Sequence, residues 1–199
     1  MAEIYGQLQV PWRLLRIPIG DALEGANSGV VDGELARTSL AEAELGRLQR
    51  IPAAIGAVRI IAYTQIGAEK VETIGDLKSK RVALFRGAVV TDQLAKESTP
   101  VYADNVAGLF ELLDKGRADV VMATKLDVDL YLNSVGKQSA YLASAPLLET
   151  KVYHFLHKRH SDLIKRLSQY MKGLQVSGEL ERIISKAELE VDYMQTARY

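Results

Sequence analysis

The chain has neither cysteine, net charge nor a long hydrophobic run in its 199 residues. Without cysteine, disulfides, thiol catalysis and cysteine-based metal sites are excluded. Lysine plus arginine number 25, and aspartate plus glutamate also number 25. The chain therefore lacks the excess of basic residues that would indicate nucleic-acid binding. No apolar stretch approaches a membrane span, and residues 1–5 lack the basic and apolar regions of a secretory signal. A hydrophobic share of 48% is ordinary for a globular protein of one domain or two small lobes, and it fits cytoplasm or periplasm equally.

An alternation of short apolar runs and helical patterns occupies the middle of the chain, between Arg81 and Thr124. The apolar runs are typical of buried strands, and Asn105 and Gly116 are suited to begin and end the second helix. Strand, helix, strand, helix, strand with short connections predicts a parallel sheet covered by helices. The predicted strands are residues 81–85, 100–102 and 119–123, and the predicted helices are 88–96 and 105–115.

Ligands of open parallel sheets collect at the carboxyl ends of the strands, beside helix N-termini whose free N–H groups attract anions. In this chain those ends are residues 85–88 and 122–125. We therefore expect one wall of a small-molecule site there. The alternative is that Gly87 only permits a tight turn between strand and helix.

The flanking regions repeat this α/β character on both sides of a polar connector, residues 67–73, which is the predicted boundary between two lobes. A layout of apolar helix end, glycine, two residues, aspartate and apolar strand occurs around Asp32 and again around Asp119, which suggests two lobes of similar construction. Further strands are predicted at 10–18, 30–36, 57–65, 141–144 and 149–157, and further helices at 19–29, 40–48, 127–135 and from 161 onward, divided at 177–178.

Four segments in order resemble the type 2 periplasmic solute-binding proteins, in particular the polar amino-acid receptors of ABC transporters (bacterial extracellular solute-binding protein family 3). Asn27–Arg37 is similar to the family's Gly-x-x-Asp strand ending in an arginine, and Ile74–Ala83 to the segment that leads into lobe two. Asp104–Val121 and Ser177–Ile183 are similar to a later helix–strand pair and to a C-terminal helix of the family.

The resemblance implies an α/β, two-lobed clamp, each lobe a mainly parallel sheet flanked by helices. Lobe one would be residues 1–66 plus 149–199, and lobe two residues 67–148. The implied function is that of a periplasmic, non-enzymatic receptor without cofactor or metal. It would capture a small polar or anionic solute, such as an amino acid, in the interlobe cleft and deliver it to an inner-membrane permease of an ABC transporter.

Two elements are implied to hold the carboxylate of the solute. Arg37 matches the family arginine that pairs with it, and a guanidinium suits this role because its planar fork binds a carboxylate bidentately. Arg86, Gly87 and Ala88 match the loop whose N–H groups bind the same carboxylate. The alternative for Arg37 is a surface arginine at a turn.

The other end of the solute is expected at Thr124, where the family usually has an aspartate for the α-amino group. Threonine can accept a hydrogen bond but cannot neutralise an ammonium, unless Asp127 bends in. Trp12 and Tyr63, near predicted strand ends, are expected to stack on the ligand, although aromatic residues in strands more often belong to the core.

Compared with the family, the chain begins near the end of the first helix, so we expect a fragment or a reduced lobe one that lacks the first strand. The exposed sheet edge would invite a homodimer. His154, His157 and His160 do not predict a metal site, because a strand points the first two to opposite faces. Two other functions remain open: a ligand-sensing effector domain, and a dehydratase-like enzyme with Glu34 and Lys125 as its acid–base pair.

Overall fold

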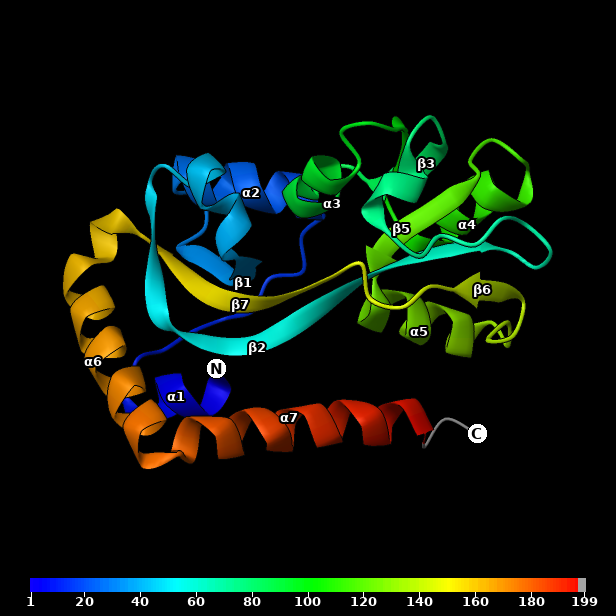
Figure 1. Cartoon of the computed structure of the whole chain (residues 1–199). Coiled ribbons are helices and arrows are strands. Elements are labelled where there is room, and N and C mark those ends of the chain that lie inside the picture. Colours follow the sequence, from blue (N-terminus) through cyan, green and yellow to red (C-terminus); the bar gives the residue numbers. More distant parts are fainter. Residues whose placement is uncertain (197–199) are drawn as a thin grey trace. The chain divides into compact units, whose positions relative to one another are not determined.

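The computed structural model describes residues 1–196, with side chains up to residue 187. The chain divides into two compact units, each described here by itself (Figure 1). Unit 1 is formed by Met1–Gly56 and the chain from Lys151 onward, and unit 2 by Ala57–Thr150. The chain passes from one unit to the other inside two long strands, β2 (Leu48–Gln65) and β7 (Leu148–His157). None of the described helices combines the length and the apolar character that a membrane crossing needs.

Unit 2 contains the predicted parallel sheet. Its strand β3 pairs in parallel with both β4 and β5, while β2 pairs antiparallel with β5 and with β6. The strands are the C-terminal part of β2, β3 (Arg81–Phe85), β4 (Thr99–Ala103), β5 (Val120–Thr124) and β6 (Tyr141–Ala143). The helices are η2 (Ile74–Leu77), α3 (Val89–Leu94), α4 (Val106–Asp114) and α5 (Lys125–Ser134).

The central strands of unit 2 are apolar from Val82 to Phe85 in β3 and from Val120 to Ala123 in β5, because both faces of the sheet are covered there. Alternate residues of one strand point to opposite faces, so Ala83 packs with Leu109 and Val128 on one side, while Val82 and Leu84 belong to a second cluster on the other. The helices α4 and α5 cover the first face. This confirms the prediction of a parallel sheet between helices for residues 81–124.

Unit 1 is built differently, because its strand β1 (Gly33–Thr38) pairs antiparallel with β7. The expectation of a mainly parallel sheet in each lobe is therefore wrong for this unit. A bulge between Glu34 and Arg37 places an extra residue in β1, and the imidazole Nδ1 of His154, from β7, lies 2.8 Å from the carbonyl oxygen of Glu34 at this bulge.

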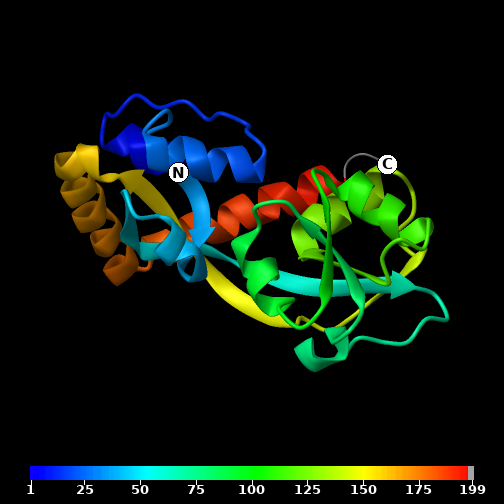
Figure 2. The same cartoon turned by 90° about the horizontal axis from the view of Figure 1, so that it is seen from above.

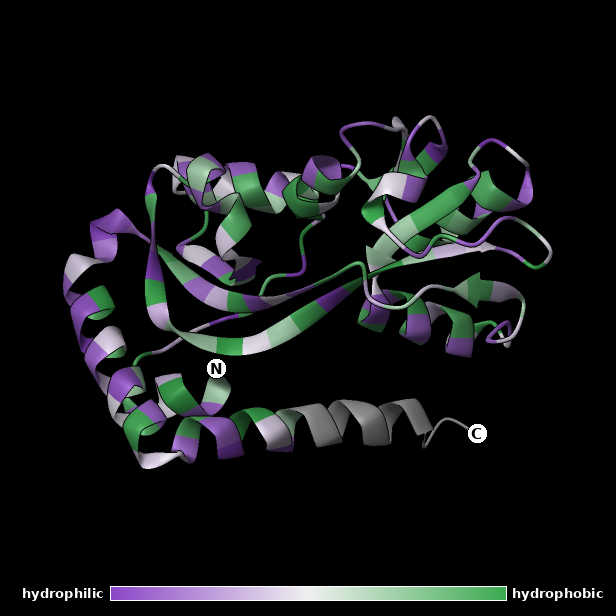
Figure 3. Cartoon of the chain, in the orientation of Figure 1, coloured by the Kyte–Doolittle hydropathy of each residue, from purple (hydrophilic) through white to green (hydrophobic). Residues whose placement is uncertain are grey.

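The helices of unit 1 bury apolar stripes against these strands. Helix α6 shows the predicted periodicity, with Ile164, Leu167 and Met171 buried, and its alternating hydropathy is visible in Figure 3. It ends at Gly178, whose φ of 76° is the left-handed conformation of a helix C-terminus. The helices of unit 1 are α1 (Ala2–Gln7), α2 (Ile19–Ser28), η1 (Ser39–Glu44), η3 (Lys158–His160), α6 (Ser161–Ser177) and α7 (Glu179–Thr196).

Two local predictions in unit 1 are wrong. Residues 10–18 were expected to be a strand, but they form no regular secondary structure and pair with no described strand. These residues favour β-structure, but a strand forms only where a neighbouring strand supplies hydrogen bonds, and none lies beside them among the described strands. Residues 40–48 were expected to be an α-helix, but only a 3₁₀ helix over Ser39–Glu44 forms before β2 begins at Leu48.

Candidate functional site

Three connections meet at one edge of the unit 2 sheet. Because β3, β4 and β5 are parallel, their carboxyl ends lie at the same edge, with Phe85 paired to Ala103 and Ala83 to Val121. The loops that follow lead into α3, α4 and α5. The sheet thus brings the predicted site residues Arg86, Gly87, Ala88 and Thr124 to a common edge, as expected for a ligand-binding α/β sheet.

At this edge Arg86 is held by two groups from β4 and its loop. Its Nε donates to Asp104 Oδ1 at 3.2 Å, and its guanidinium carbon lies 5.6 Å from the ring centre of Tyr102. The Tyr102 hydroxyl donates to Asp92 Oδ1 at 3.1 Å. Burial raises the pKa of Asp92, and the hydrogen bond from Tyr102 opposes this shift. The positive charge of Arg86 therefore lies between an aromatic face and a carboxylate.

The Gly87 loop uses most of its expected N–H donors internally. The amide of Arg86 donates to Ala103 O at 3.1 Å, and the amide of Ala88 donates to Phe85 O at 3.2 Å. Gly87 has a φ of 81°, which a residue with a side chain rarely adopts. The turn hydrogen bonds thus occupy the amides on either side of Gly87, those of Arg86 and Ala88.

Thr124 acts as the N-cap of α5. Its hydroxyl donates to the carboxylate of Asp127, whose own amide lies 3.4 Å from the hydroxyl oxygen, and the neighbouring Lys125 pairs with Asp129. The Asp127 carboxylate consequently stands beside Thr124 at the carboxyl end of β5. This gives the edge an acidic group next to the threonine.

Arg37 is buried in unit 1, with 7% of its surface exposed. One terminal nitrogen donates to Glu34 Oε1 at 2.8 Å and to Ile19 O at 3.0 Å. The hydrogen bond from Arg37 to Ile19 O connects β1 to the first turn of α2. Arg37 is therefore an internal ion-pair partner and not the surface arginine of the alternative interpretation.

The two predicted stacking residues lie in different environments. Trp12 is 45% exposed and stacks on Tyr5, with ring centres 6.1 Å apart. Tyr63 is only 3% exposed and packs edge-on against Phe110 in the unit 2 core, so its ring has no free face for a solute. The expectation that Tyr63 stacks on a ligand is wrong, because a strand residue pointing to the helix-covered face is core.

The histidines are used for structure. His154 Nε2 lies 2.7 Å from the Tyr5 hydroxyl, and His160 Nε2 lies 2.7 Å from Asp32 Oδ1. Among the residues with described side chains, no group of three histidine, aspartate or glutamate residues could hold a metal ion. The open acid–base pair is also engaged, since Glu34 binds Arg37 and Lys125 binds Asp129.

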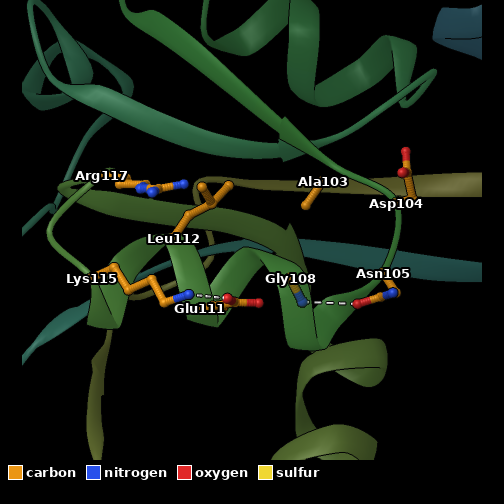
Figure 4. A pocket seen from close by; sticks show the side chains of 8 residues that line it. All are labelled: Ala103, Asp104, Asn105, Gly108, Glu111, Leu112, Lys115 and Arg117. Atoms are coloured by element: carbon orange, nitrogen blue, oxygen red, sulfur yellow. Dashed lines mark hydrogen bonds and ion pairs between the residues drawn. The ribbon is translucent and has the colours of Figure 1, made fainter.

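Each unit has a hollow on its described surface, and neither of these two hollows contains a predicted site residue. The hollow of unit 2 lies along α4 (Figure 4), where Lys115 pairs with Glu111 and the Asn105 side chain accepts from the amide of Gly108 at 2.8 Å. Part of its polar lining is thus paired internally, while Asp104 pairs with Arg86 outside the hollow. The hollow of unit 1 lies between η1 and the start of β2 and includes Arg50 and Lys158.

The comparisons with solved structures define the class of fold. The chain has the fold of the two-lobed, type 2 periplasmic binding proteins. It is similar to a substrate-binding protein of an amino acid ABC transporter at 18% identity and a TM-score of 0.73, covering 93% of this chain and 83% of that one. An amino acid ABC transporter substrate-binding protein from Streptococcus pneumoniae, bound to L-arginine, gives 16% identity and a TM-score of 0.70, with 94% and 80% covered.

A third solved structure belongs to a different functional class. It is a histidine kinase sensor domain with similarity to periplasmic binding proteins, at 17% identity and a TM-score of 0.77, covering 93% of this chain and 82% of that one. No protein-family model and no curated protein matches the chain. The resemblance deduced from the four segments is thereby confirmed as a resemblance of fold.

The structure adds residues to the edge that the sequence did not single out for binding, namely Tyr102, Asp104 and Asp92. Tyr102 is 39% exposed and its ring lies under the guanidinium of Arg86. The position of Asp104 in the sequence could have indicated it, because Asp104 directly follows β4, whose carboxyl end lies at the same edge of the sheet.

Proposed function

We propose that the chain is a solute-binding receptor of an ABC-type transporter, located in the periplasm, which captures a small polar or anionic solute such as an amino acid. The fold of the chain supports this proposal, because 93% of the chain aligns with the structure of a substrate-binding protein of an amino acid ABC transporter. In this proposal the two units act as lobes that close on the solute by hinge bending, with the division inside β2 after Gly56 rather than at the predicted residue 66.

The carboxyl-terminal edge of the unit 2 strands offers groups for both ends of an amino acid. The Arg86–Asp104 contact uses Nε, so we assign the terminal nitrogens of Arg86, with the Gly87 amide, to the carboxylate of the solute. The hydroxyl of Thr124 and the carboxylate of Asp127 are assigned to its ammonium group. A carboxylate supplies the negative charge that threonine lacks.

Unit 1 contributes Arg37 in this proposal, which would have to exchange the Glu34 carboxylate for that of the solute. Trp12 is not retained as a stacking residue for the solute, because its exposed ring stacks on Tyr5 in the connection between α1 and α2. Tyr63 is not retained, because it is buried.

A thermal-shift screen against amino acids and small carboxylates tests the proposal. A ligand that binds only the folded state stabilises it by about 2.7 kcal/mol at a hundredfold excess over its dissociation constant. We expect a clear rise of the melting temperature with one class of solute. Arg86→Gln should remove this rise, while the control Lys172→Gln, an exposed lysine on α6, should keep it. No response to any solute, or an unchanged response in Arg86→Gln, would contradict the assignment.

The assignment of Asp127 has its own test. Asp127→Asn should weaken the binding of amino acids strongly and the binding of carboxylates without an ammonium group little, because it removes only the charge beside Thr124. Isothermal titration calorimetry with L-glutamate and glutarate distinguishes the two effects. Equal losses for both ligands would exclude the proposed contact with the ammonium.

A ligand-sensing effector domain is the second candidate function, favoured by the similarity to the histidine kinase sensor domain. The two functions separate in a host strain lacking the gene. A receptor requires that uptake of the identified solute is lost and that the chain binds the permease of the transporter. A sensor requires that uptake persists while the transcriptional response to the solute is lost.

The expected homodimer through an edge of lobe one and the dehydratase-like activity are tested separately. In the strand order of unit 1, β1 is terminal, and its bulge limits how many residues could pair with a second copy. A monomeric mass by light scattering at all concentrations would refute the dimer.

The enzyme would convert a prephenate-like substrate, and the absence of turnover with such substrates would support a binding protein.

A further inference from the structure

The connection between α1 and α2 exposes an unusual density of large apolar side chains. Every residue from Pro11 to Ile19 is exposed, and residues 11–18 have no regular secondary structure. Figure 2 shows this dark blue coil at the outer rim of unit 1, beside α2. The exposed fractions are 45% for Trp12, 52% for Leu14, 46% for Leu15, 37% for Ile17 and 40% for Ile19.

This density distinguishes the connection from the rest of the described surface. Other strongly exposed apolar residues, such as Val30, Ile66 and Val176, occur singly along the chain. Single exposed apolar residues are normal on soluble proteins, whereas a contiguous group marks a surface for a partner or a membrane.

The same segment carries a local positive charge. Arg13 and Arg16 alternate with the apolar residues, and no acidic residue occurs between Glu3 and Asp21. Neither arginine is among the ion pairs formed by the described side chains. The connection therefore combines two unpaired cations with five apolar side chains in a chain of zero net charge.

We propose that residues 12–17 dock this chain on the surface of a membrane that contains anionic phospholipids. Tryptophan is favoured at the membrane–water interface, and arginine can lay its apolar stem along acyl chains while its guanidinium binds phosphate. The contact is shallow, because an irregular backbone cannot enter the hydrocarbon with its N–H and C=O groups unpaired. Stacking of Trp12 on Tyr5 holds the segment to the folded unit.

Charge favours the membrane over a second copy of this chain as the occupant. A two-fold dimer through this surface would bring Arg13 and Arg16 of both copies together, without an acidic residue on the segment to compensate. An anionic lipid surface instead attracts both arginines.

Trp12 makes the test direct, because it is the only tryptophan in the chain. Its fluorescence should shift to shorter wavelength, and brominated acyl chains should quench it, when phosphatidylcholine vesicles containing phosphatidylglycerol are added. Vesicles of phosphatidylcholine alone should bind more weakly. Each arginine contributes about 1 kcal/mol, so Arg13→Gln with Arg16→Gln should lower the vesicle partition coefficient by about fivefold per residue.

Matched variants separate docking from general effects on the protein. Leu14→Ser with Leu15→Ser should abolish binding, while Val176→Ser on α6 and Lys172→Gln should leave it unchanged. Circular dichroism and the melting temperature check that each variant is folded.

Three results would overturn the proposal. The first is no binding to anionic vesicles, and the second is equal binding by the wild type and the double arginine variant. The third is a Trp12 shift that depends on protein concentration without vesicles, which would identify a second copy as the occupant.

Discussion

Acidification should destabilise the protein through His154, which unit 1 buries in its neutral form. The side chain is 5% exposed, with Nδ1 2.8 Å from Glu34 O and Nε2 2.7 Å from the Tyr5 hydroxyl. A carbonyl oxygen only accepts, so Nδ1 carries the proton and Nε2 accepts from the tyrosine. Burial lowers the pKa of His154 from 6.5 to about 4, against the opposing effect of the backbone carbonyls.

The sign of the effect follows from the two pKa values. Between pH 6.5 and about 4 the unfolded chain binds a proton at His154 and the folded chain does not. The free energy of unfolding therefore falls as the pH decreases through this window, and the stabilisation is fully present above it. At 1.36 kcal/mol per pH unit, the shift corresponds to a loss of about 3 kcal/mol. This is a large part of the 5–15 kcal/mol typical of proteins, roughly a fifth to three fifths of the free energy of unfolding.

Urea unfolding of the wild type and of His154→Gln at neutral pH and near pH 4 isolates this contribution from that of the carboxylates. The wild type should lose about 3 kcal/mol more than the variant over this interval. Titration of the imidazole by NMR measures the pKa in the wild type itself, so the test survives if the variant folds poorly. An imidazole pKa above 6, or equal acid losses in both proteins, would refute the reasoning.

Two further predictions concern packing in unit 1. Arg37→Ala should lower the free energy of unfolding by about 3 kcal/mol, because it leaves the Glu34 carboxylate buried without a partner, and the double variant with Glu34→Ala should recover part of this loss in chemical denaturation. An effect below 1 kcal/mol would show that the pair is not structural. Gly33→Ala should cost about 2 kcal/mol or more, because its Cβ would clash with the carbonyl oxygen of Phe155, whereas Gly46→Ala meets no atom within 4 Å and should change the melting temperature little. Equal effects of these two glycine substitutions would contradict the close approach of β1 and β7.

The central part of unit 2 was predictable because its signals are local. The run 81–85 is apolar from Val82 onward, since both faces of β3 are covered, and it forms the predicted strand. Asn105 begins α4, where its side chain accepts from Gly108, and Gly178 ends α6 in a left-handed conformation. Helix caps and periodic apolar stripes depend on residues a few positions apart, so they can be recognised in the sequence alone.

Which residues gather at the carboxyl-terminal edge of the unit 2 strands was decided by tertiary pairing. The sequence placed Arg86 and Thr124 at strand ends, and the parallel register then brought Asp104 and Tyr102 beside Arg86 from another strand. Asp127 was recognised only as a residue that would have to bend toward the site, and helix capping by Thr124 positions it there.

What the sequence by itself determined about this protein was its α/β class, its apolar central strands and the glycine and asparagine residues that bound its helices. Tertiary structure alone decided that residues 10–18 remain an exposed coil, that Tyr63 faces the core, and that Arg37 pairs with Glu34. The physical reason is the range of the interactions. Propensity and capping are properties of adjacent residues, whereas strand pairing, burial and ion pairing depend on which distant segment of the chain occupies the neighbouring space.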